Sequence, residues 1–124
     1  MRWMRGSFRW LAVLFLVALV VQFFLAGLGV FGAESFEAHR TLGYALQGGA
    51  ILLLLLALVG RLGRSVIWPT ALLVVLAIVQ SLLAAAKDDA RYLAALHVVN
   101  ALAIVVLAQL VAYRAWRQDG GVSR

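Results

Sequence analysis

Two histidines, His39 and His97, are the residues of this chain best suited to chemistry. Each lies in or beside a long apolar segment, and two neutral imidazoles that face each other across a helix bundle are the usual axial pair of a b-type heme. The chain contains no cysteine, which excludes iron–sulfur clusters, thiolate nucleophiles and covalent c-type heme attachment. The pair therefore predicts one heme b, with His39 and His97 as ligands of its iron.

Three further polar residues are expected near the histidines, in the same half of a membrane. They are Gln22, Gln80 and Asn100. Strongly polar groups within a membrane span are functional candidates, because hydrocarbon makes them costly. We therefore include all three in the candidate cofactor site. The alternative is that His39 is only an interfacial histidine, and that His97 and Asn100 only join helices by hydrogen bonds to Gln22 or Gln80. We also expect a purely joining role for Gln47 and Gln109.

Two neighbours of His39 complete the candidate site. Gly43, one helical turn later, lets a porphyrin face or another helix approach closely, and Arg40 is positioned to pair with a heme propionate or a lipid phosphate. Depth is an objection to a shared iron. His97 lies about six residues inside its apolar segment, roughly 9 Å below the boundary at 1.5 Å per residue, whereas His39 lies at the boundary.

The composition defines the class of protein that must hold these residues. Of 124 residues, 65% are hydrophobic and 13% are charged. A soluble domain has about a quarter of its residues charged. This composition excludes a soluble enzyme, a disordered tail and a disulfide-stapled secreted domain, and indicates a membrane protein.

Four charge-free segments of 24, 20, 22 and 22 residues follow one another along the chain. About 20 residues of helix cross a hydrocarbon core, and helices satisfy their own backbone hydrogen bonds there. We predict helices near residues 9–31, 36–60, 65–86 and 90–115, with a flexible tail over 118–124. Since the connections are short, the fold class is all-α, a single transmembrane antiparallel four-helix bundle.

The basic residues predict its orientation. Eight of them, with one acidic residue, lie on the side of the two termini, whereas the opposite side has three basic and four acidic residues. Both termini are therefore expected in the cytoplasm of a bacterium, with the helices in the inner membrane. The net charge of +6 then reflects topology and not nucleic-acid binding.

No convincing internal repeat is visible, although two hairpins of similar length are compatible with an ancient duplication.

Three stretches carry a resemblance to known proteins: FEAHRTLGY at 36–44, ALHVVNAL at 95–102 and VQFFLAG at 21–27. They resemble a family of small bacterial four-span membrane proteins of unknown function, over nearly the whole chain. The segment from His39 to Gly43 is also similar to the heme-bearing bundles of heme A synthase and, more loosely, to diheme b-type membrane cytochromes. That resemblance implies that His39 and His97 occupy axial-ligand positions. The single histidine pair allows one heme at most.

Several functions remain open at this point. The first is a membrane cytochrome or heme-handling protein that exchanges electrons with quinone or another membrane redox partner, and is not an enzyme on its own. The second is a cofactor-free bundle that acts as a partner subunit or binds lipid or quinone. A small permease is disfavoured, because no Asp, Glu, Lys or Arg lies within the hydrocarbon region. A metal ion held by the histidines with Glu34 or Glu37 is a further alternative, and homo-oligomers are compatible with each of these.

Overall fold

The computed structural model describes residues 2–86, 88 and 90–118. Within them the chain forms four long helices and no strand: α1 (Arg2–Val30), α2 (Glu37–Val59), α3 (Arg64–Ala85) and α4 (Arg91–Arg117). The all-helical prediction is confirmed. Both terminal helices run further into the basic segments than expected, because long arginine side chains allow a helix to continue past the apolar boundary. Residues 119–124 of the expected tail lie outside the described part of the chain.

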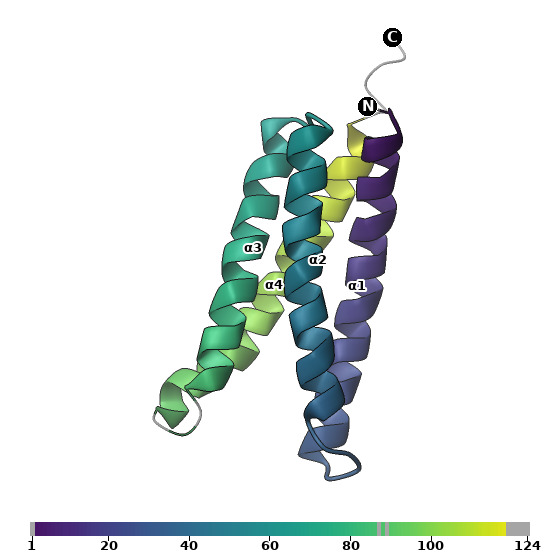
Figure 1. Cartoon of the computed structure of the whole chain (residues 1–124). Helices are drawn as coiled ribbons and strands as arrows, with labels where there is room; N and C mark the ends of the chain where they lie inside the picture. Colours follow the sequence, from purple (N-terminus) through teal and green to yellow (C-terminus); the bar gives the residue numbers. More distant parts are fainter. Residues whose placement is uncertain (1, 87, 89, 119–124) are drawn as a thin grey trace.

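The four helices form a ring in chain order, in which each helix packs against the next and α4 closes onto α1 (Figure 1). Neighbours are antiparallel, so α2 and α4 are diagonal partners that run in the same direction. All four are long and apolar enough to cross a membrane. Large apolar side chains cover the outer surface; Val20, for example, is 71% exposed and Leu82 is 65% exposed. The fold therefore fits a multi-pass membrane protein.

The packed core occupies only the end of the bundle where α1 begins and α4 ends. In the described part of the chain, no residue from 20 to 45 or from 78 to 103 is fully buried. In Figure 1 the hairpin α1–α2 and the hairpin α3–α4 lie together at that end and diverge toward their connecting loops. We call these the closed end and the open end of the bundle. The histidines lie toward the open end.

The buried positions of the two hairpins follow the same pattern. Each of the following pairs of buried residues is separated by the same interval of 58 residues: Phe8 and Val66, Ala12 and Thr70, Phe15 and Leu73, Leu19 and Ala77, Leu46 and Ile104, Ala50 and Ala108, Leu53 and Val111, Ala57 and Ala115. This common pattern fits the ancient duplication with which the two hairpins are compatible. At most of these positions the two hairpins have apolar side chains of different shape. The spacing of the buried positions is therefore the same in both hairpins, although the residue types differ.

Arginines of α1 hold the closed end together. The guanidinium of Arg5 donates to the carbonyl oxygen of Gly60 at 3.4 Å, and that of Arg9 donates to Ala115 at 3.1 Å. Both acceptors lie at or near the carboxyl ends of helices, where positive charge is favourable. Arg9 also lies 5.5 Å from the ring centre of Trp116. These contacts fasten α1 to both helices that flank it.

Candidate functional site

The two histidines lie close together in the open half of the bundle, each seven residues from the nearest fully buried residue of its helix. His39 is the third residue of α2 and His97 the seventh of α4. Their ring centres lie 6.2 Å apart with an angle of 65° between the ring planes. The expected difference in depth is therefore wrong. The charges mark the helix ends poorly here: α4 begins one turn further from its histidine than α2 does, which allows the two rings to approach each other.

A reciprocal pair of hydrogen bonds holds each histidine, and we call each pair a Gln–His clamp. In the first hairpin, the Gln22 side-chain amide donates to the carbonyl oxygen of His39 at 2.8 Å, and His39 Nδ1 lies 3.1 Å from the carbonyl oxygen of Gln22. In the second hairpin, the Gln80 side-chain amide donates to the backbone carbonyl oxygen of His97 at 3.0 Å, and His97 Nδ1 lies 3.1 Å from the backbone carbonyl oxygen of Gln80. The clamps are related by the same 58-residue interval as the core.

The clamps determine which ring nitrogen is available for chemistry. A backbone carbonyl only accepts hydrogen bonds, so Nδ1 of His39 and of His97 must carry the proton in the neutral ring. The lone pair is then on Nε2. In the part of the chain that the structure describes, neither Nε2 forms a hydrogen bond. A histidine that donates one ring N–H to a carbonyl and keeps the other nitrogen free has the arrangement of a metal ligand.

Asn100 makes the second clamp more complete than the first. Its amide nitrogen donates to the carbonyl oxygen of Leu76 at 2.9 Å and to Gln80 Oε1 at 2.6 Å. Its counterpart in the first hairpin is Leu42, which has no polar group to offer. Gln22 Oε1 is accordingly buried without a hydrogen-bond partner. The two histidines are thus held alike, but Gln80 has a full set of partners and Gln22 does not.

The two predicted neighbours of His39 have different roles. A Cβ atom on Gly43 would lie 3.1 Å from the amide nitrogen of Gln22, so the glycine makes room for the clamp. Arg40 is exposed, and none of the hydrogen bonds of the clamps involves its side chain. Its pairing with a heme propionate stays a prediction.

The other polar residues lie away from the histidine rings. Ser81 donates to Gln47 Oε1 at 2.7 Å and so joins α3 to α2, which fits the expected joining role of Gln47. Gln109 is exposed on α4. Within the described residues no group of three or more His, Cys, Asp or Glu side chains comes together. The alternative of a metal ion held jointly by the histidines and Glu34 or Glu37 therefore has no support.

Sequence reasoning missed Phe36 and the relation between Leu42 and Asn100. The ring centre of Phe36 lies 6.1 Å from that of His39 in an edge-to-face contact. The same ring packs over Gly29, where a Cβ atom would lie only 2.6 Å from it. Gln22 and Gln80 are 58 residues apart in the sequence, and so are His39 and His97. This shared interval is the signal from which the sequences of the two hairpins could be aligned.

The matched region in a comparison with protein families includes this site. Residues 22–87, more than half of the chain, match a family of unknown function, DUF6220. The chain belongs to the DUF6220 family. The matched region of this DUF6220 protein contains the whole first clamp and Gln80 of the second. This confirms the resemblance to a family of unknown function, while the likeness to heme proteins gains no support from it. Comparisons with curated proteins and with solved structures gave no match.

Proposed function

We propose that this DUF6220 protein binds one heme b between His39 and His97 and serves as a membrane cytochrome or heme-handling protein. The observation that carries the proposal is the 6.2 Å separation of the imidazole centres. A metal–nitrogen bond is about 2 Å long, so two imidazoles on one metal place their ring centres roughly 6 Å apart. The spacing between the rings is thus close to what a shared iron requires.

The donor chemistry and the surroundings also favour this function. Each clamp leaves Nε2 with its lone pair, and each histidine comes from a different hairpin. Because the open end lacks fully buried side chains, the hairpins can accept a flat group between them with little loss of packing. Bound heme supplies one-electron chemistry. The protein's own residues hold the two imidazoles, and Arg40 offers a positive charge beside His39 for a propionate.

We further propose that the helices span a bacterial inner membrane with both termini in the cytoplasm. The closed end carries the basic residues of α1 and of the carboxyl end of α4, including Arg5, Arg9 and Arg114. Lys and Arg favour the cytoplasmic side. The histidines then lie in the outer half of the membrane, where quinone or another membrane redox carrier is the expected partner.

The test is the absorption spectrum of the detergent-purified protein, oxidised and then reduced with dithionite, after expression with heme precursor. We expect sharp α and Soret bands at about one heme per chain in the reduced protein. The exposed Gln109→Ala variant should keep these bands, whereas His97→Ala should not. A flat visible spectrum that persists after heme is added would refute the proposal. The cofactor-free function, as a partner subunit or a lipid- or quinone-binding bundle, would then be favoured.

A further inference from the structure

We infer that the two histidines are unequal ligands, and that His39 is the one that leaves the iron when a small exogenous ligand binds. This inference rests on the proposed function and deepens it, because it ranks the two ligands of the site. Three independent observations carry it: the hydrogen bonds of the two clamps, the positions of the histidines along their helices, and a groove in the first hairpin.

The clamp of His39 lacks one hydrogen bond. Asn100 donates a hydrogen bond to Gln80 Oε1, and Gln80 Nε2 donates one to the carbonyl oxygen of His97. Both polar atoms of the Gln80 side chain are therefore hydrogen-bonded. Gln22 has no such partner, because Leu42 stands at the corresponding position, and its oxygen is buried unpaired. A buried acceptor without a partner gains from any rearrangement that exposes it. Displacement of His39 therefore meets less resistance than displacement of His97.

The helix position acts in the same direction. His39 lies in the first turn of α2, where backbone N–H groups lack partners within the helix and the end frays easily. His97 follows six helical residues of α4 and lies a full turn further from the helix end. Release of His39 requires only the first turn of α2 to move. Release of His97 requires part of an established helix to move, together with the bonds of Asn100.

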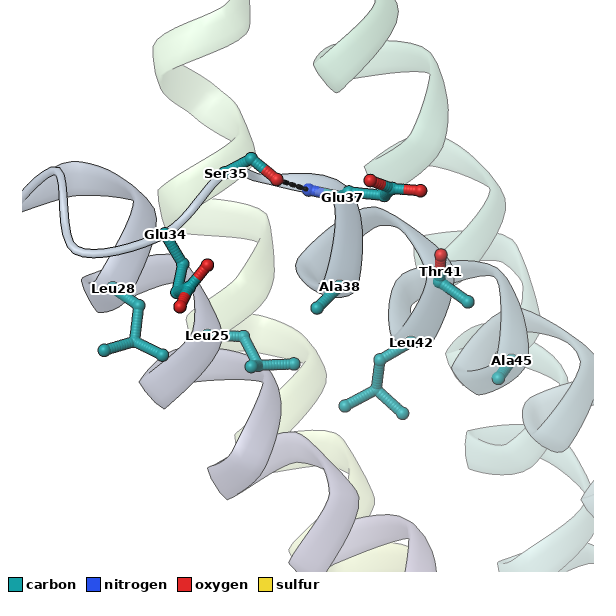
Figure 2. Close-up of a pocket in the computed structure, with 9 residues that line it drawn as sticks. All are labelled: Leu25, Leu28, Glu34, Ser35, Glu37, Ala38, Thr41, Leu42 and Ala45. Carbon is teal, nitrogen blue, oxygen red and sulfur yellow. Dashed lines mark hydrogen bonds between the residues drawn. The ribbon is translucent and has the colours of Figure 1, made fainter.

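A groove of about 630 Å³ lies between α1 and α2 on this same hairpin (Figure 2). Ala38, Thr41 and Leu42 line it, whereas His39 itself does not. At its rim, the backbone N–H of Glu37 donates to Ser35 Oγ at 3.4 Å. The groove thus reaches the helical turn that carries His39. It gives that turn space to shift.

The experiment is carbon monoxide binding to the dithionite-reduced holoprotein, followed by the shift of the Soret band. Leu42→Asn supplies the first clamp with the amide that Asn100 supplies to the second. We expect it to weaken carbon monoxide binding roughly three- to tenfold, the range of one hydrogen bond within a membrane. Tyr44→Asn is the matched control: it places the same amide on the same helix, at an exposed position that does not line the groove, and should leave the affinity unchanged.

Asn100→Leu provides a second measurement that does not depend on the folding of Leu42→Asn. It removes the hydrogen bond to Gln80 Oε1, so that the His97 clamp lacks the same bond as the His39 clamp. Either histidine can then be displaced at the same cost, and the carbon monoxide affinity should rise by no more than about twofold. An increase of tenfold or more would identify His97 as the labile ligand and overturn the inference. So would an unchanged affinity in Leu42→Asn with heme still bound. Absence of heme from the wild-type protein would instead overturn the proposed function, and this inference with it.

Discussion

The hairpins α1–α2 and α3–α4 hold their histidines by the same bonds but surround them with different residues. The glutamine, the histidine and the positions of the buried residues recur after 58 residues. The residues around each clamp do not: Leu42 corresponds to Asn100, and Phe36 corresponds to Ala94. The Gln–His hydrogen bonds and the buried positions are thus the same in both hairpins, whereas the residues that pack against each clamp differ. A symmetric fold can in this way produce an asymmetric site.

The two interfaces between the hairpins differ in the same manner. Ser81 of α3 donates to Gln47 of α2, while the corresponding positions at the interface of α1 with α4 are Phe23 and Val105. One interface therefore contains a polar bond in addition to apolar packing. At the other interface, the contacts that the described residues show are apolar packing and, at the closed end, the contacts of Arg9 with Ala115 and Trp116. Substitutions at corresponding positions of the two halves should reveal these differences.

The largest expected effect is on heme binding when each histidine is removed. We expect His97→Ala to lose more than about 100-fold in heme affinity, because it removes the better-held ligand. His39→Ala should keep a weaker heme affinity, because His97 would still hold the group. Heme titration of the two apoproteins checks this order. Equal losses in both variants would mean that the two ligands are equivalent.

Core truncation at corresponding positions should give the next largest effect. Phe8 and its counterpart Val66 are both fully buried at the closed end. Phe8→Ala should lower the free energy of unfolding by about 3 kcal/mol or more, and Val66→Ala by less, because the phenyl ring leaves the larger cavity. Thermal unfolding in detergent, followed by circular dichroism, measures both. A larger loss in Val66→Ala would show that the closed end packs mainly through α3.

Replacing the glutamines compares the clamps directly. Gln80→Leu should destabilise the protein by about 1–3 kcal/mol, because it removes the donor to His97 and the acceptor for Asn100. Gln22→Leu should cost less, since it also removes the buried oxygen that has no partner. Unfolding of the heme-free proteins under one detergent condition is the measurement. The reverse order would contradict the stated difference between the clamps.

The smallest expected effect is at the interface of α2 with α3. Ser81→Ala removes the bond to Gln47 and should cost about 0.6 kcal/mol, the average for a hydrogen bond between membrane helices. Combining it with Gln47→Leu in a double-mutant cycle isolates the coupling between the two side chains. A coupling energy of zero would show that α2 and α3 associate by packing alone.

Composition and the distribution of charge were sufficient to predict the helices and their antiparallel order. Charge-free segments of helical length have few alternatives in a membrane, because the backbone must satisfy its own hydrogen bonds. They also identified Gln22, His39, Gln80, His97 and Asn100 as candidate residues, and the structure joins them in the two clamps and Asn100's bond to Gln80. These residues stood out because polar groups are rare in such segments.

Relative depth and the pairing of side chains were not predictable in the same way. Charges mark the end of each helix only to within a turn, which is the error that separated His39 from His97. The role of Leu42 was hidden because an apolar residue in an apolar segment carries no signal by itself. Only its alignment with Asn100 shows that a hydrogen bond is missing there.

The repeated unit contains two helices, and that even number has a consequence for symmetry. A chain that crosses a layer twice returns to its starting side, so the second copy begins in the same sense as the first. The α2 and α4 helices consequently run in the same direction (Figure 1), and their histidine rings lie 6.2 Å apart. A unit with an odd number of helices would invert its copy, as in transporters with inverted repeats, and would direct the two imidazoles toward opposite faces. Because each unit has an even number of helices, the two histidines lie on helices that run in the same direction and can face each other.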